Sequence, residues 1–255
     1  FASIDNHTTM SLGNAVGSII CNTGLILGLV ALISPFKVDK DMFFSKSVFL
    51  LISVLALMIL GINKSIGKAD GILLIIILIF YMYSNVKGVS GRGNKRSDFS
   101  NELNSCNNKP EKHENLKITV LFVLGLIMMV VGSRLLVDNG VKLAGYIGIP
   151  QGVISLTVIA LGTSLPELVS SLTAIKKHHH GISVGNVLGA NILNITSVIG
   201  ISSLINDLPI LAQNIRIDFS FMITLLLLLI LPTMVTHKLQ RVQGLLMLGT
   251  YIIYI

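Results

Sequence analysis

Long apolar runs recur along the whole chain and leave it few folds to adopt. Complete runs cover about residues 10–33, 43–62, 71–86, 116–137, 151–175, 182–205, 219–235 and 243–255, and residues 1–4 resemble the end of another. Most of them approach the ~20 residues that an α-helix needs to cross the hydrocarbon core of a bilayer. Backbone polar groups find no water there, so the runs must form helices that satisfy their own hydrogen bonds. The sequence therefore predicts an all-α polytopic membrane protein.

The composition supports this class and argues against others. Hydrophobic residues make up 52% of the chain and charged residues only 12%, which is typical of membrane proteins. The net charge of +7 does not indicate nucleic-acid binding, because the basic residues fall between apolar runs and no nucleic-acid motif is present. We find no nucleophile–base pair and no metal triad in the runs, so we expect no enzyme and no cofactor. No obligate protein partner is evident from the sequence, and we expect the protein to lie in the lipid bilayer.

The two halves of the chain repeat one another. At an offset of 172 residues, five of the ten positions of Gly13–Asn22 are identical in Gly185–Asn194. An offset of 173 then aligns Gly71 with Gly244. Residues 88–115, the only sizeable polar stretch, lie between the halves and read as a flexible linker. We therefore assign residues 1–87 to the remainder of a first repeat and residues 116–255 to a second repeat.

The number of runs in a repeat sets its orientation. The second half contains five runs, and an odd number places the two repeats in opposite orientations across the membrane. Inverted repeats of this kind build transporters in which broken helices meet at the midplane. If the linker is cytoplasmic, fourteen Lys and Arg residues, among them Lys46 in the connection after the first complete run, lie at inside ends and five at outside ends, as the positive-inside rule requires. We expect a bacterial plasma-membrane protein with a cytoplasmic linker.

One carboxylate lies near the middle of an apolar run. Eight residues separate Glu167 from Lys176 and 15 separate it from Gln151. A charge at this depth costs at least ~2.5 kcal/mol, so such groups usually have a function. On a helix, Glu167 shares a face with the set Ala160, Thr163 and Ser164. Carbonyl, hydroxyl and carboxylate oxygens suit a hard cation such as Ca²⁺ or Na⁺.

The same helix should be broken where these oxygens gather. Pro166 lacks a backbone donor and Gly162 loosens the turn, so freed carbonyls, including that of Ala160, become possible ligands. A simple proline kink, with the hydroxyls bonded back to the helix, is the alternative interpretation. Asn22 and Asn194 also lie in apolar runs and need partners. They either join two helices or face the same cation cavity as Glu167.

These motifs resemble the sodium/calcium exchanger family, the cation/calcium antiporters, over essentially the whole chain. The resemblance lies in Gly162-Thr163-Ser164-Leu165-Pro166-Glu167 and in the Gly-Asn-x-x-Gly-[Ser/Ala] segments at Gly13 and Gly185. It implies two inverted five-helix repeats with ion sites between the second, third, seventh and eighth helices. The chain would then be an N-terminally truncated member of bacterial type, beginning near the end of helix two, and the repeat mate of Glu167 would precede Phe1.

The resemblance also implies roles for individual residues. Glu167 would be a principal Ca²⁺ and Na⁺ ligand, and its side of the site would be completed by Thr163, Ser164 and the Ala160 carbonyl. Asn194 and Asn22 match polar positions of helices eight and three, and Ser18 matches a hydroxyl ligand of helix three. Two departures are visible. Ala190 stands where some members have Ser, and Asn194 stands where some have Asp, so one hydroxyl and one charge are absent.

The implied function is an antiporter that exchanges Ca²⁺ for Na⁺ by alternating access, with the transported ions as its ligands. One alternative is an H⁺/Ca²⁺ antiporter, in which protonation of Glu167 replaces Na⁺. Proton-coupled relatives tend to show Gly-Asn-x-x-Glu where this chain has Gly-Thr-Ser-x-Pro-Glu. A passive cation channel or a membrane scaffold is a different class, which inverted repeats with broken helices argue against.

Overall fold

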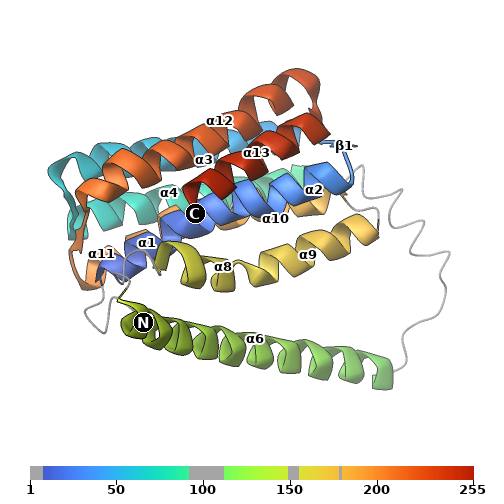
Figure 1. The fold of residues 1–255 in the computed structure, drawn as a ribbon. Coiled ribbons are helices and arrows are strands. Elements are labelled where there is room, and N and C mark those ends of the chain that lie inside the picture. Colours follow the sequence, from blue (N-terminus) through green and yellow to red (C-terminus); the bar gives the residue numbers. More distant parts are fainter. Residues whose placement is uncertain (1–7, 92–111, 149–154, 178–179) are drawn as a thin grey trace. The chain divides into compact units, whose positions relative to one another are not determined.

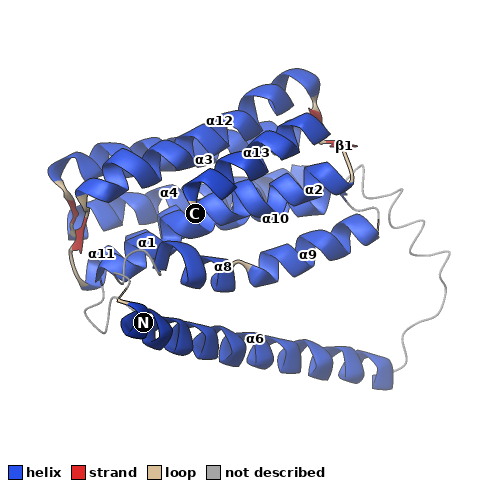
Figure 2. Ribbon diagram, viewed as in Figure 1, coloured by secondary structure: helices blue, strands red, loops and turns tan. Residues whose placement is uncertain are grey.

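Helices account for nearly all of the described chain (Figures 1 and 2). The computed structural model describes residues 8–91, 112–148, 155–177 and 180–255. The chain forms two compact units, residues 1–78 with 136–255 and residues 79–135. The prediction of an all-α membrane protein is confirmed. Five described spans are long and apolar enough to cross a bilayer: Ser11–Ile33, Lys40–Asn63, Lys68–Lys87, Gly181–Ile205 and Asn214–Thr236.

The helices of the first half begin with a long, nearly continuous one, and the second half repeats the arrangement. The first-half elements are α1 (Thr8–Ile20), η1 (Cys21–Leu27), α2 (Gly28–Ile33), α3 (Lys40–Leu60), η2 (Gly61–Asn63) and α4 (Lys68–Gly91). The second-half elements are α6 (Lys112–Ile147), η3 (Ser155–Ile159), α8 (Ala160–Thr163), α9 (Leu165–Lys176), α10 (His180–Leu193), η4 (Asn194–Ile199), α11 (Gly200–Ile205), η5 (Asn214–Asp218), α12 (Phe219–Thr236) and α13 (Arg241–Tyr254). Helices α4 and α6 extend four residues into each end of the predicted linker 88–115, whose remainder lies outside the described residues.

The two short strand pairs reproduce the internal repeat. Strand β1 (Phe36–Lys37) pairs with β4 (Lys238–Leu239), and β2 (Ser65–Ile66) pairs with β3 (Leu208–Pro209). In the first pair Phe36 faces Leu239. Adding 172 to Phe36 gives Leu208 and subtracting 173 from Leu239 gives Ile66, and these two residues face one another in the second pair. The prediction of two inverted repeats is confirmed by this exchange of partners.

Close helix contacts at glycine repeat in the same way. A Cβ at Gly71 would lie 2.7 Å from the Gly200 carbonyl oxygen, and a Cβ at Gly244 would lie 2.7 Å from the Gly28 carbonyl oxygen. Gly28 and Gly200 are related by the offset of 172, as Gly71 and Gly244 are by 173. In both halves a glycine is therefore needed because two helix backbones touch.

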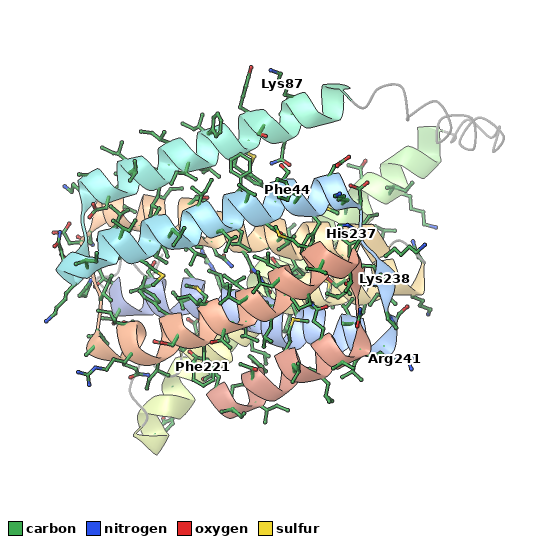
Figure 3. The ribbon with its side chains drawn as sticks, turned by 90° about the horizontal axis from the view of Figure 1, so that it is seen from above. Phe44, Lys87, Phe221, His237, Lys238 and Arg241 are labelled. Carbon is green, nitrogen blue, oxygen red and sulfur yellow. The ribbon has the colours of Figure 1, made fainter. Side chains whose placement is uncertain are left out.

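The turns after α3 and α12 have matching backbones. Lys64 and His237, also 173 residues apart, have φ values of 60° and 52°, in the left-handed region. Figure 3 shows His237 beside Lys238 and Arg241 at the turn between α12 and α13. Lys238 and Arg241 are among the basic residues that predict a cytoplasmic end for the bundle.

The helix α1–η1–α2 lies at the centre of the larger unit. In its most apolar window 78% of the residues are buried inside the protein, against 33% for α3. Fully buried Ile19 and Ile20 on α1 and Leu188 and Ile192 on α10 form part of this core. The π-helical segments η1 and η4 follow α1 and α10 at equivalent places, and such segments are frequent at functional sites.

Candidate functional site

The helix that carries Glu167 is broken at Ser164, as predicted. Helix α8 ends at Thr163 and α9 starts at Leu165, with Ser164 at φ −92° and ψ −2° between them. Pro166 lies in the first turn of α9, where its missing N–H removes no helical bond. The same absence removes the donor that a continuous helix would offer to the Gly162 carbonyl. The break therefore places Glu167 in the first turn of a new helix.

Thr163 fastens α8 to α1. Its Oγ1 lies 3.1 Å from the Ser18 hydroxyl, and the Asn14 Oδ1 and the Ala160 carbonyl, each also at 3.1 Å, share its one proton. Gly17 permits this approach, because a Cβ there would lie only 2.5 Å from the Leu156 carbonyl oxygen. Two predicted ligands, Ser18 and Thr163, are thus brought together.

The Ala160 carbonyl differs from the expectation that the break leaves it free. It accepts hydrogen bonds from the Thr163 hydroxyl and from the Ser164 N–H, both at 3.1 Å. The reason is that Ser164 lies four residues after Ala160, so its N–H makes the ordinary helical bond to that carbonyl, and the missing N–H of Pro166 affects the Gly162 carbonyl instead. The alternative interpretation, a simple proline kink with hydroxyls bonded back to their own helix, is correct for the bond from Thr163 to Ala160. It does not account for the bonds of Thr163 to Ser18 and Asn14 on α1.

Asn22 both joins two helices and keeps a free acceptor. Its Nδ2 donates to the Asn191 Oδ1 at 3.0 Å, and the Asn191 Nδ2 donates to the Thr23 hydroxyl at 3.0 Å. The bridge connects η1 with α10, and the Asn22 Oδ1 remains buried without a hydrogen-bond partner. Because the amide nitrogen is committed to Asn191, the amide oxygen is the atom available to a cation.

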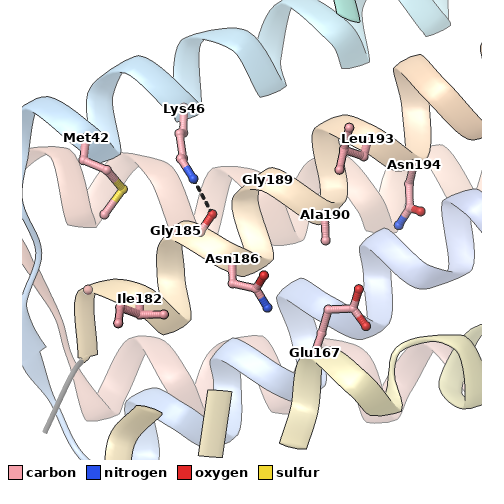
Figure 4. A pocket seen from close by; sticks show the side chains of 11 residues that line it. Met42, Lys46, Glu167, Ile182, Gly185, Asn186, Gly189, Ala190, Leu193 and Asn194 are labelled. Atoms are coloured by element: carbon pink, nitrogen blue, oxygen red, sulfur yellow. Dashed lines mark hydrogen bonds between the residues drawn. The ribbon is translucent and has the colours of Figure 1, made fainter. Parts of the chain in front are cut away.

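Glu167 and Asn194 line one open pocket of about 710 Å³ (Figure 4). Its other polar side chains are Lys46 and Asn186, and the small side chain of Ala190 forms part of the wall beside Asn194. The remaining lining residues are Met42, Gly181, Ile182, Gly185, Gly189 and Leu193. The pocket therefore runs from Glu167 along α10 to the first turns of α3 and α10.

Three predicted ligands carry buried oxygen atoms without a hydrogen-bond partner: the Glu167 Oε2, the Ser164 Oγ and the Asn22 Oδ1. The Cys21 thiol, next to Asn22 in the chain, lies near both Ser164 and Glu167. The buried hydroxyls of Ser47, Ser171 and Ser183 also lack partners. Buried polar atoms are nearly always paired, and a cluster of oxygens is the donor set that Ca²⁺ and Na⁺ prefer.

Sequence reasoning missed several residues of this region. Asn14 is identical to Asn186 at the offset of 172, and this identity between the halves could have marked Asn14 as a candidate site residue. Asn191 aligns with Ile19, and its partner Thr23 aligns with Ile195, so the repeat gives no indication of their bond. No group of three or more His, Cys, Asp or Glu suited to a metal occurs among the described residues.

The chain matches known membrane transporters over most of its length. Residues 1–87 and 117–255 match the family model for sodium/calcium exchanger proteins. The chain is 39% identical to an uncharacterized membrane protein of Methanocaldococcus jannaschii, over all of this chain and 78% of that protein. It is 28% identical to the sodium/calcium exchanger MaX1 of Methanosarcina acetivorans, over all of this chain and 81% of that protein.

A solved structure agrees with these sequence matches. A structure of the sodium–calcium exchanger NCX_Mj, soaked with Na⁺ and Sr²⁺, superposes with a TM-score of 0.75 at 38% identity. The superposition covers 99% of this chain and 78% of that one. The family resemblance inferred from the two motif types is thereby confirmed. The chain belongs to the sodium/calcium exchanger family and is an integral membrane transporter, not an enzyme.

Proposed function

We propose that this protein exchanges Ca²⁺ for Na⁺ across the membrane by alternating access, with Glu167 as the central ligand. The observation that carries the proposal is the Glu167 Oε2, which is buried in a pocket wall and bonded to no donor. A carboxylate in a membrane span is costly without a partner. A bound cation supplies that partner.

The ligand set around Glu167 consists of neutral oxygens. Ser164 and Asn22 contribute unpartnered acceptors, and Asn194 lines the same pocket as Glu167. Ser18 and Thr163 are bonded to one another, and each hydroxyl oxygen keeps a lone pair for an ion. Ca²⁺ takes six to eight such oxygens in flexible geometry, and Na⁺ takes the same hard donors.

Exchange follows from competition for these oxygens. A second cation beside the first would add uncompensated positive charge where the dielectric constant is low, so Ca²⁺ and Na⁺ exclude one another. An unoccupied carboxylate is poorly suited to leave water, so the loaded site changes its side of the membrane more readily. These two conditions couple the flux of one ion to the counter-flux of the other.

The test is transport by the purified protein in lipid vesicles. An outward Na⁺ gradient should drive uptake of radioactive Ca²⁺, a protonophore should leave the uptake unchanged, and Glu167→Gln should abolish it while retaining the thermal unfolding temperature. Thr173→Val is the matched control on α9, because the Thr173 hydroxyl is exposed and bonds only its own helix at the Val169 carbonyl. Uptake driven by a pH gradient and stopped by the protonophore would establish the H⁺/Ca²⁺ antiporter instead. Uptake without any counter-ion would establish a channel.

A further inference from the structure

Lys46 places its ammonium group inside the pocket of Glu167. It lies seven residues into α3, within a membrane span, and is only partly exposed. Its Nζ donates to the Gly185 carbonyl oxygen on α10 at 2.6 Å (Figure 4). A Cβ at Gly185 would lie 3.5 Å from the Nζ, at ordinary van der Waals distance, so Lys46 packs directly against α10. Counting basic residues along the sequence places Lys46 in a connection, whereas the structure places it in a pocket wall.

The charge of Lys46 is not neutralised by a carboxylate in the described part of the chain. Its hydrogen-bond partner is the backbone carbonyl of Gly185, and Figure 4 shows Glu167 across the pocket with Asn186 between them. Glu167 and Lys46 are the acidic and the basic side chain of this pocket lining. An ionisable group held inside a membrane span without a counter-ion is costly to maintain, which argues for a function.

The repeat shows that the fold does not require a base at this position. With the offset of 172, Lys46 corresponds to Asp218. The register holds here, because Leu50 and Met222, also 172 residues apart, are both fully buried. Asp218 accepts hydrogen bonds from Asn214 at 2.8 Å and from Tyr254 at 3.0 Å. The two halves therefore carry opposite charges at equivalent places.

We propose that Lys46 is a specificity-determining residue: its fixed positive charge in the pocket of Glu167 lowers the affinity of the Glu167 site for divalent cations more than for monovalent ones. This proposal rests on cation binding at Glu167, as argued above. The repulsion between Lys46 and an ion in the pocket scales with the charge of the ion. The logarithm of the affinity for Ca²⁺ is therefore shifted twice as far as that for Na⁺.

The size of the effect follows from the pocket. A sphere of about 710 Å³ is about 11 Å across, and at such a separation in a partly hydrated pocket a unit charge changes the affinity for a divalent ion about tenfold. The affinity for Na⁺ should then change about threefold, the square root of that factor. A purely structural role of Lys46 would not produce this two-to-one relation.

The experiment measures equilibrium binding of Ca²⁺ and, by competition, of Na⁺ to the purified protein. Lys46→Met removes the charge and keeps the length of the side chain, Lys46→Arg keeps the charge, and Lys37→Met removes an exposed charge from β1, outside this pocket. We expect Lys46→Met to tighten Ca²⁺ binding about tenfold and Na⁺ binding about threefold. Lys46→Arg and Lys37→Met should stay within about twofold of the wild type.

Two results separate the possible failures. If the wild type binds neither ion, the proposed function is wrong and the role of Lys46 is wrong with it. If the wild type binds both ions and Lys46→Met shifts them equally or not at all, only the role of Lys46 is wrong. Should Lys46→Met not fold, Lys46→Gln also removes the charge and gives the same decision, with the same two-to-one relation between the logarithms of the Ca²⁺ and Na⁺ affinities.

Discussion

Replacing Gly17 by alanine tests whether the ion site depends on the contact between α1 and the broken helix. The added Cβ would lie 2.5 Å from the Leu156 carbonyl oxygen and 2.8 Å from the Ala160 Cβ. Ordinary van der Waals contact begins at 3.4 Å, so α1 and the η3–α8 segment must separate by about 0.9 Å (3.4 minus 2.5). Neither obstacle is the flexible end of a long side chain, so the strain cannot be relieved locally.

The separation has consequences for both stability and binding. Overpacking of this kind costs about 1–3 kcal/mol of unfolding free energy. It also stretches the Ser18–Thr163 hydrogen bond from 3.1 Å to about 4 Å, beyond the range of such bonds. A hydrogen bond contributes roughly 0.5–1.5 kcal/mol, so the Ca²⁺ affinity should fall by up to about tenfold.

The assays are thermal unfolding in detergent and calorimetric Ca²⁺ binding. The control is Gly249→Ala on α13, where a Cβ would meet nothing within 4 Å and where alanine should be neutral or stabilising by up to about 1 kcal/mol. If Gly17→Ala unfolds and binds Ca²⁺ like the wild type, then α1 and α8 do not need this close approach, and the reasoning that connects Gly17 to the ion ligands is wrong.

Four further substitutions test other contacts of the fold. Asn191→Leu removes two hydrogen bonds and leaves the amide of Asn22 without its acceptor, so it should lower the unfolding free energy by about 2–3 kcal/mol and weaken Ca²⁺ binding in calorimetry. Gln243→Leu removes three hydrogen bonds of Nε2, to Leu228, Leu229 and Thr233, and should lower the unfolding temperature without changing the Ca²⁺ affinity, because Gln243 does not line the pocket. In Gly71→Ala and Gly244→Ala the added Cβ meets the carbonyl oxygen of Gly200 or Gly28, at 2.7 Å in both repeats. The two variants should lower the free energy of unfolding in urea by amounts within about 1 kcal/mol of one another. A large difference would contradict the equivalence of the two contacts.

The membrane spans, the break near Pro166 and the repeat were predictable because each depends on residues close together in the chain or on identity between the halves. Apolar run length determines spanning helices, and a proline without an N–H interrupts a helix wherever it lies. The exchange of strand partners follows from the offset between the halves, which the sequence already contains. These features need no knowledge of which side chain faces which neighbour.

The contacts of individual polar groups could not be predicted in the same way. The Ala160 carbonyl was expected to be free, but its helical donor is the Ser164 N–H, which is present, and Pro166 deprives the Gly162 carbonyl instead. The Asn22–Asn191 bond joins residues that the repeat does not relate. Lys46 looked like an interfacial charge because hydropathy does not reveal which face of α3 meets α10.

The strand pairs also limit how the transporter can change shape. Helix α3 runs between β1 and β2, so the pair β1–β4 and the pair β2–β3 lie at its two ends, and each pair clasps a connector of one repeat to a connector of the other (Figure 2). Rocking one repeat as a rigid body against the other would break the backbone hydrogen bonds of both strand pairs, at the two ends of α3. Opening toward one side of the bilayer should therefore arise from helices that slide along the part of the bundle joined by the two strand pairs. That part should keep its form while the other helices move.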